Sequence, residues 1–290
     1  MDSWEKAGRI SAEVLEYGSK LIEIGGSAIE VLDKIEAKIY ELGGKPAFPA
    51  QISINDLAAH VIPENNVVFK ENDIVKLDIG AHVDGHVADN AKTIDLGNNE
   101  DLVKASKLAL NEAIKVIKPG AKLYEIGSVV EKTITEFGFK PIKNLFGHGI
   151  DIYELHARYS IPNFDNKNKS ELKEGQIIAI EPFATNGIGM IKDGKLSGIY
   201  NVTNIKQVRD NNTREILKFI LENYNMLPFA KRWLLKKFPE FKVSFALRTL
   251  EKESIVYHYP QLPEVSQGLV SQHEFTVLVK DKPKILTKVD

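Results

Sequence analysis

The chain has 290 residues, no cysteine, and 38 Lys and Arg against 40 Asp and Glu, for a formal net charge of −2. The missing cysteines exclude a disulfide framework and a Cys-ligated zinc site. The small net charge argues against attraction of the whole surface to nucleic acid or to an anionic membrane. Residues 1–18 lack the apolar core of a signal peptide, and no apolar run spans a membrane. We therefore expect a cytoplasmic protein.

Groups of predicted helices and strands follow one another along the chain. Periodicity predicts helices over 3–22, 27–42, 99–117 and 121–137, and strands over 73–82, 86–95, 175–182, 199–209 and 270–280. Three further helical segments, TREILKFILENY, FAKRWLLKKF and FALRTLEKES, interrupt the strand pattern between Tyr200 and Tyr257. We interpret 205–256 as a helical subdomain inserted into a single catalytic domain that spans 1–290.

Two segments 95 residues apart resemble each other. Residues 25–48 (GGSAIEVLDKIEAKIYELGGKPAF) match 120–143 (GAKLYEIGSVVEKTITEFGFKPIK) at eight identical positions, among them Gly43 with Gly138 and Pro46 with Pro141. About one or two matches are expected by chance. Each copy predicts an amphipathic helix that ends at a glycine and is followed by a proline.

The parallel continues beyond the two helices. His60 follows the first copy and His156 the second, and the strands ENDIVKLDI and KEGQIIAIEP then align Asp78 with Glu181. Two unrelated helix–strand units would be the simpler interpretation. The repeat favours two pseudo-twofold α/β halves that direct acids and histidines toward a shared centre.

The stretch KLDIGAHVDGHVADNAKTIDLG (76–97) contains the first candidate site. Asp84-Gly85 is typical of a two-residue hairpin turn. Such a hairpin pairs Gly80 with Asp89, so Asp78 and Asp89 emerge on one face as diagonal neighbours about 7 Å apart or less. Two buried like charges at this spacing require a positive partner, and a metal ion supplies it.

The other polar residues of this stretch are assigned to the turn and the strand end. His82 shares the face of Asp78 but lies about 13 Å further along the strand. We therefore interpret His82, Asp84 and His86 as turn residues and Asp95 as a solvated residue near the strand end.

Three more candidates lie further along the chain. Glycines flank His148 in NLFGHGI, and Glu181 ends the apolar strand QIIAIEP. Glu274 lies in the β-rich run SQHEFTVLVK, where an exposed edge position is the simpler interpretation. A buried acid at a strand end needs a partner or a metal. Together with the hairpin aspartates, these residues form an oxygen-rich set that suits Mn²⁺, Co²⁺, Fe²⁺ or Zn²⁺.

The motifs KLDIGAHVDGHVADNA, NLFGHGI, AIEPFATNG and QHEFTVLV resemble the metal motifs of the pita-bread metallopeptidases. The chain is most similar to type 2 methionine aminopeptidases, because of FPAQISINDLAAH (48–60) and the helical insert. Its N-terminus, without a long charged extension, resembles the archaeal form. The resemblance implies an α+β pita-bread fold, with two pseudo-twofold halves around a curved antiparallel sheet.

The resemblance also implies a ligand set for two divalent ions. Asp78 and Asp89 would hold one ion, and His148 and Glu181 would complete the coordination of the other. Asp89 and Glu274 would bridge the two ions. A water activated between them would attack the first peptide bond.

Further roles follow from the same resemblance. Glu181 would move the proton as general base and acid, His156 would stabilise the scissile carbonyl oxygen, and His60 would lie near the scissile nitrogen. Phe48, Leu155 and Tyr259 would be apolar or aromatic neighbours of the methionine side chain. The positions around Ile199 and Tyr200 have no assigned counterpart.

The predicted activity is removal of the initiator methionine from nascent chains with a small second residue. The predicted partners are nascent N-termini and the ribosome, with no DNA, no membrane and a monomeric state. One alternative is a prolidase-like X-Pro peptidase, disfavoured because the first repeat helix starts near residue 27 and leaves no room for a separate N-terminal domain. The other is a non-catalytic ribosome- or RNA-binding protein, for which AKRWLLKKF would supply a basic surface.

Overall fold

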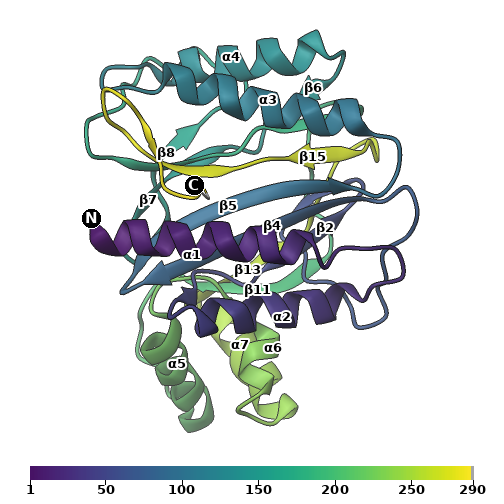
Figure 1. Ribbon diagram of the computed structural model, residues 1–290. Helices are drawn as coiled ribbons and strands as arrows, with labels where there is room; N and C mark the ends of the chain where they lie inside the picture. Colours follow the sequence, from purple (N-terminus) through teal and green to yellow (C-terminus); the bar gives the residue numbers. More distant parts are fainter. Residues whose placement is uncertain (289–290) are drawn as a thin grey trace.

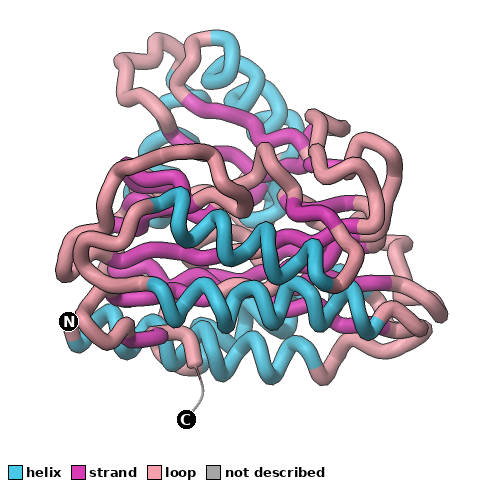
Figure 2. The backbone as a smooth tube through the Cα atoms, turned by 90° about the horizontal axis from the view of Figure 1, so that it is seen from above, coloured by secondary structure: helices cyan, strands magenta, loops and turns pink. Residues whose placement is uncertain are grey.

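A pair of amphipathic helices opens each half of the chain. In the computed structural model, which describes residues 1–288, the first pair is α1 (Asp2–Ser19) and α2 (Ala28–Glu41), and the second is α3 (Glu100–Val116) and α4 (Leu123–Glu136). These are the four helices that periodicity predicted, to within a few residues. They run roughly alongside the strands and bury their apolar faces against them (Figures 1 and 2).

The first half is built around a long hairpin. Its strands β4 (Ile74–Val83) and β5 (His86–Asp95) pair over their full length. The strands β1 (Lys45–Pro46) and β2 (Gln51–Ile54) also pair with β4. All four strands are antiparallel, and β3 (Leu57–Ala59) continues the chain beyond β2 toward His60.

The second half contains two antiparallel sheets. The larger has the strand order β17-β16-β9-β7-β8, and the smaller has the order β15-β10-β6. Their bounds are β6 (Lys140–Pro141), β7 (Gly147–Asp151), β8 (Glu154–Ile161), β9 (Ile177–Ile180), β10 (Phe183–Thr185), β15 (Val270–Gln272), β16 (Phe275–Leu278) and β17 (Lys284–Ile285).

The strands predicted over 175–182 and 270–280 are each divided in two. The first breaks at Glu181 between β9 and β10, and the second breaks at Glu274 between β15 and β16. The two breaks face each other, because β9 with β16 and β10 with β15 continue one antiparallel register. Only the outer neighbour changes, from β7 beside β9 to β6 beside β10. The prediction of single strands was wrong here, because the interruption arises where two distant segments face each other, and neither segment shows it by itself.

The two halves repeat the same local arrangement. The glycines that end α2 and α4, Gly43 and Gly138, both have positive φ angles, 79° and 83°. Each is followed by a Lys-Pro strand. In the first half this strand, β1, pairs with β4, which carries Asp78. In the second half the strand β6 pairs with β10, which follows Glu181. The predicted α+β pita-bread fold with pseudo-twofold halves is confirmed.

A third group of elements lies at the lower end of Figure 1. Helices α5, α6 and α7 pack on a three-stranded sheet of order β12-β11-β13 and share an apolar core with it. The strand predicted over 199–209 ends early, at Val202. The assignment of 205–256 as a separate subdomain stays a prediction. The bounds are β11 (Leu196–Val202), α5 (Asn211–Tyr224), β12 (Phe229–Ala230), α6 (Lys231–Leu235), α7 (Glu240–Lys252), β13 (Val256–Pro260) and β14 (Leu262–Pro263), the last of which pairs with β3.

Among residues 1–288, no helix combines the length and the apolar character needed to cross a lipid bilayer.

Candidate metal centre and substrate cavity

The hairpin β4–β5 has the predicted turn and register. Asp84 and Gly85 have φ angles of 50° and 82°, as a two-residue hairpin turn requires. Gly80 is opposite Asp89 and Asp78 is opposite Ala91, which places Asp78 and Asp89 on the same face. Both side chains reach one cavity of about 150 Å³.

Every residue proposed for the site lines this cavity. It therefore joins side chains from both halves of the chain with others from β11 and β13, which frame the helical segment. The lining residues are Phe48, Gln51, Ala59, His60, Asp78, Asp89, Leu145, Phe146, His148, Leu155, His156, Glu181, Ile199, Pro228, Tyr259 and Glu274.

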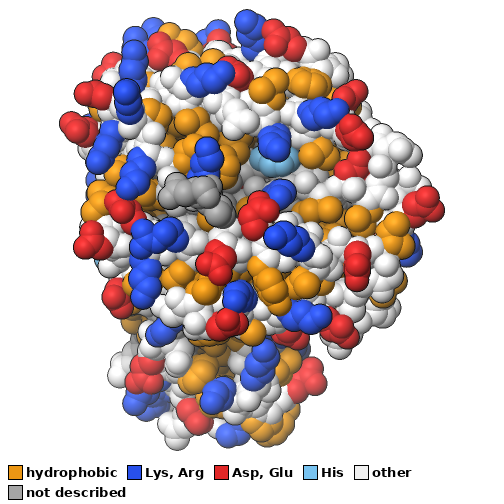
Figure 3. All heavy atoms as spheres, in the orientation of Figure 1, with side chains coloured by type: hydrophobic (Ala, Val, Ile, Leu, Met, Phe, Trp, Pro, Cys, Tyr) orange, Lys and Arg blue, Asp and Glu red, His pale blue; other side chains and the backbone are white. Residues whose placement is uncertain are grey.

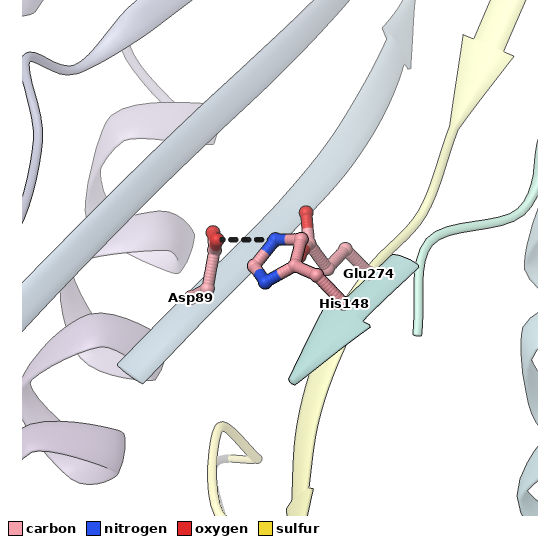
Figure 4. A group of neighbouring side chains, drawn as sticks. All are labelled: Asp89, His148 and Glu274. Carbon is pink, nitrogen blue, oxygen red and sulfur yellow. Dashed lines mark ion pairs between the residues drawn. The ribbon is translucent and has the colours of Figure 1, made fainter. Parts of the chain in front are cut away.

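Three of these side chains point toward one another (Figure 4). Asp89, His148 and Glu274 each offer one ligand atom, and these atoms lie within 4.8 Å of one another. His148 Nε2 lies 3.6 Å from Asp89 Oδ2 and 3.8 Å from Glu181 Oε1, longer than hydrogen bonds. The arrangement is that of donors around a shared point rather than of a closed hydrogen-bond network.

The tautomer of His148 follows from its backbone contact. Its Nδ1 lies 3.1 Å from the carbonyl oxygen of Gly149, so Nδ1 carries the proton and donates it. Nε2 keeps its lone pair and faces the carboxylates. Burial lowers the pKa of His148 to about 3, so the ring is neutral at neutral pH. A neutral imidazole with its second nitrogen bound to a carbonyl is the usual form of a metal-ligating histidine.

The four acids repel one another. Burial raises the pKa of Asp78 to about 7. Burial and the neighbouring carboxylates raise the pKa values of Asp89, Glu181 and Glu274 well above their usual range. Without a cation, ionising all four together is therefore unfavourable.

Several carboxylate oxygens also lack a partner. Asp78 Oδ1, Asp89 Oδ1 and Glu274 Oε1 are buried and accept no hydrogen bond from any residue between 1 and 288. An unpaired buried acceptor is costly. Unpaired carboxylate oxygens beside a neutral imidazole nitrogen match the donor set that binds divalent transition-metal ions. The residues present therefore fit a metal centre.

His60 and His156 lie at the cavity beside this cluster. His60 Nδ1 lies 3.2 Å from the carbonyl oxygen of Pro260, and its ring meets that of Tyr259 edge-on at 5.0 Å. The His156 ring meets that of His148 edge-on at 4.5 Å. Burial lowers the pKa values of both His60 and His156 to about 4, so each ring is neutral at neutral pH.

The apolar wall includes the predicted Phe48, Leu155 and Tyr259. Phe48 packs directly over Gly80, where an added Cβ would lie 2.2 Å from the Phe48 ring. Phe146 and Pro228 also belong to this wall, although neither was predicted as a site residue. Strand alternation from His148 would have found Phe146, whereas Pro228 carries no local signal.

Gln272, which was not predicted as a site residue, contacts two of the acids. Its Nε2 donates to Glu181 Oε2 at 3.4 Å and to Glu274 Oε2 at 3.3 Å. The Thr93 hydroxyl holds the backbone of Gln272, donating to its carbonyl oxygen at 2.6 Å and accepting from its N–H at 2.8 Å. The position of Gln272 two residues before Glu274 was the available signal.

The residues assigned to the turn lie outside the cavity. The His82 Nδ1 accepts the N–H of Gly85 at 3.2 Å, and His86 Nδ1 lies 3.0 Å from the carbonyl oxygen of Val83. Asp84 is exposed at the tip of the turn. Asp95 is not simply solvated, because it accepts the N–H groups of Gly97 and Asn99 and so shapes the turn after β5.

Comparison with known sequences identifies the family. Residues 2–216 match the model of metallopeptidase family M24. The chain is 48% identical to a methionine aminopeptidase of Archaeoglobus fulgidus over 97% of this chain and 96% of the relative. It is 45% identical to a methionine aminopeptidase of Methanocaldococcus jannaschii over 97% of each.

Solved structures agree on the fold. A methionine aminopeptidase of Thermotoga maritima aligns over 99% of this chain and 96% of its own, with a TM-score of 0.73 and 24% identity. A thermophilic Arx1 aligns over 100% and 91%, with a TM-score of 0.86 and 16% identity. The prolidase of Pyrococcus furiosus aligns over 100% of this chain but 64% of its own, with a TM-score of 0.63 and 19% identity. This chain belongs to metallopeptidase family M24.

Proposed function

We propose that this protein is a methionine aminopeptidase, which removes the N-terminal methionine from nascent proteins with a small second residue. The observation that carries the proposal is the single cavity in which four acids and three histidines meet an apolar wall. Relatives of the same length at 45–48% identity are methionine aminopeptidases, which supports this substrate over an X-Pro peptide.

The proposed metal centre holds two divalent ions, with Co²⁺, Mn²⁺, Fe²⁺ and Zn²⁺ as candidates. Four ionised carboxylates carry four negative charges, which two divalent cations neutralise. Asp78 and Asp89 would hold one ion, and His148 and Glu181 would complete the other. Asp89 and Glu274 would bridge the pair. The ions, when bound, activate a water and polarise the scissile carbonyl.

The remaining chemistry belongs to side chains of this chain. Glu181 would accept the proton of the attacking water and pass it to the leaving amine. Neutral His156 would donate to the carbonyl oxygen as negative charge develops there. His60, with Nδ1 directed to the Pro260 carbonyl, would orient its other ring nitrogen toward the scissile amide. Phe48, Leu155 and Tyr259 would receive the methionine side chain, whose thioether makes favourable contacts with aromatic rings.

The test is release of free methionine from a Met-Ala-Ser peptide in the presence of Mn²⁺ or Co²⁺. Asp89→Ala and Glu274→Ala should abolish release, whereas Asp84→Asn at the exposed turn should leave it unchanged. Met-Leu and Xaa-Pro peptides should be poor substrates. A folded wild-type protein that releases no methionine with any divalent metal would contradict the proposal.

We also propose that the protein acts in the cytoplasm as a monomer that contacts the ribosome. All the cavity residues come from one chain, so the site needs no second copy. Segment 205–256 carries eleven Lys and Arg against six Asp and Glu, although the whole chain is slightly acidic. Phe241 and Phe245 are 72% and 56% exposed on α7. Basic side chains around exposed aromatic rings suit ribosomal RNA.

The face shown in Figure 3 carries Lys and Arg interspersed with Asp and Glu, without a single-sign patch. Ribosome contact is therefore proposed for the helical segment rather than for the molecule as a whole. Co-sedimentation with 70S ribosomes should fall in a Phe241→Ala, Phe245→Ala double variant and should stay unchanged in Lys132→Ala on exposed α4. Equal sedimentation of all three proteins would contradict this contact.

A further inference from the structure

The strand pair β11–β13 contains a bulge beside the cavity. Leu196 is opposite Pro260 and Tyr200 is opposite His258, so three residues of β11, 197–199, face the single residue Tyr259. A bulge leaves backbone groups without ladder partners and redirects side chains. Here Ile199 at the bulge and Tyr259 across from it both line the cavity.

Side chains replace the missing ladder bonds. The Gly198 N–H donates to His258 Nε2 at 3.0 Å, and the Ile199 N–H donates to the Ser197 hydroxyl at 3.0 Å. The same hydroxyl donates to the carbonyl oxygen of Tyr259 at 2.7 Å. Ser197 is 8% exposed, so these contacts are shielded from water. The two cavity-lining residues are thereby linked through a single serine hydroxyl.

His258 is itself held in one orientation. Its Nδ1 lies 2.9 Å from Glu251 Oε1 on α7, and its ring stacks on Tyr200 with the centroids 3.9 Å apart. Nδ1–H therefore donates to the carboxylate, and Nε2 is left to accept. Burial lowers the pKa of His258 and nearby Lys231 lowers it further, whereas Glu251 raises it.

We propose that His258 and Ser197 are positioning residues that pin the bulge at 197–199 and so set the shape of the pocket for the substrate's first side chain. Gly198 has a φ angle of +80°, a backbone conformation that glycine adopts without strain. The bulge is therefore free to relax once its side-chain partners are lost, and Ile199 would move with it. This inference rests on the proposed aminopeptidase function.

The test compares His258→Phe, which keeps a ring over Tyr200 but removes the acceptor, with His258→Gln, which restores an acceptor. Ser197→Ala is a second, independent variant, and Lys252→Ala on the exposed side of α7 is the control. Kinetics are measured on peptides with methionine, norleucine or leucine first and the same second residue. Hydrogen exchange of the Gly198 amide is followed by NMR.

The free energy of a hydrogen bond of this kind corresponds to about a five- to tenfold change in a binding constant. In His258→Phe and Ser197→Ala we expect KM for the methionine peptide to rise by that factor, with a smaller change in kcat and reduced preference for methionine over leucine. Gly198 should lose exchange protection in His258→Phe and regain it in His258→Gln. The control should match the wild type throughout.

Failure of the positioning role and failure of the proposed function give different results. An active wild type whose KM and selectivity stay unchanged in both His258→Phe and Ser197→Ala overturns the positioning role while leaving the proposed function in place. An unprotected Gly198 amide in the wild type also overturns it, independently of any activity. A wild type that releases no methionine overturns the proposed function itself.

Discussion

Thr276 holds the backbone of Asp89 from the opposite half of the molecule. Its hydroxyl accepts the Asp89 N–H and donates to the Asp89 carbonyl oxygen, both at 2.8 Å. Next to this contact, Glu274 N–H donates to the carbonyl oxygen of Ala91. Two acids of the proposed metal centre are therefore positioned by the same junction between β5 and β16.

This junction predicts the effect of Thr276→Val. The variant keeps the side-chain shape but leaves the buried Asp89 N–H unpaired, so the free energy of unfolding should fall by about 2 kcal/mol. Metal affinity should also fall, because Asp89 loses its fixed orientation. Urea unfolding and calorimetric Mn²⁺ titration measure the two effects. Thr276→Ser keeps the hydroxyl and should stay close to the wild type. Equal loss in both variants would mean that the methyl group, and not the hydroxyl, is responsible.

Asp89→Asn should separate metal binding from stability. The variant removes one of four mutually repelling buried acids, so the metal-free protein should be at least as stable as the wild type. Mn²⁺ affinity should fall by more than about 100-fold, since loss of a direct ligand exceeds the cost of losing an outer contact. Thermal unfolding in EDTA and metal titration test this pair. A metal-free variant less stable than the wild type would argue against electrostatic repulsion at this site.

Lys76 predicts a pH dependence of stability. Its side chain is 1% exposed, and burial lowers its pKa to about 7, although its Nζ donates to the carbonyl oxygen of Asn55 at 2.7 Å. Between about pH 7 and pH 10.5 the unfolded chain keeps a proton here that the folded protein releases. Since the unfolded state binds more protons, this residue makes stability rise with pH across that interval.

Lys76→Met removes this titration and fills the same space. The difference in unfolding free energy between variant and wild type should favour the variant near pH 7 and shrink as pH rises toward 10, on the order of 1.4 kcal/mol per pKa unit. Urea unfolding of both proteins in EDTA at pH 6.5, 8 and 9.5 provides the measurement. A constant difference across these pH values would show that Lys76 titrates normally.

Glu36 of α2 anchors the helical segment to the first half. Its carboxylate forms an ion pair with Arg232, and Trp233 Nε1 donates to it at 2.8 Å. Burial raises the pKa of Glu36, outweighing the opposing effect of Arg232. Glu36→Ala leaves both partners without their acceptor and should lower the unfolding free energy by about 3 kcal/mol.

Asp33 provides a matched comparison, because it also bonds Arg232, at 2.7 Å, but its side chain is 53% exposed. Asp33→Ala should cost less than about 1 kcal/mol. Chemical denaturation of the two variants side by side decides the point. Similar losses in both would contradict the argument that burial makes Glu36 the stronger anchor.

Local sequence patterns were sufficient to predict the features that depend on neighbouring residues. Asp84-Gly85 determined the β4–β5 turn and its register, because a two-residue turn with positive φ angles leaves one pairing. Strand alternation then placed Asp78 and Asp89 on one face. Helical periodicity likewise determined α1 to α4, whose apolar stripes repeat every three to four residues.

Tertiary structure decided the features that depend on distant partners. Local composition does not encode the breaks at Glu181 and Glu274, because they lie opposite each other in the pairing of two segments that are distant in the chain. Nor does it encode the bulge before Tyr200, which exists only against β13 and is held by His258 from 60 residues away. The sequence by itself therefore determined which acids and histidines this protein offers. Long-range strand pairing decided that they converge on one cavity and which apolar side chains close it, because hydrogen-bonded register between distant strands is a property of the folded chain alone.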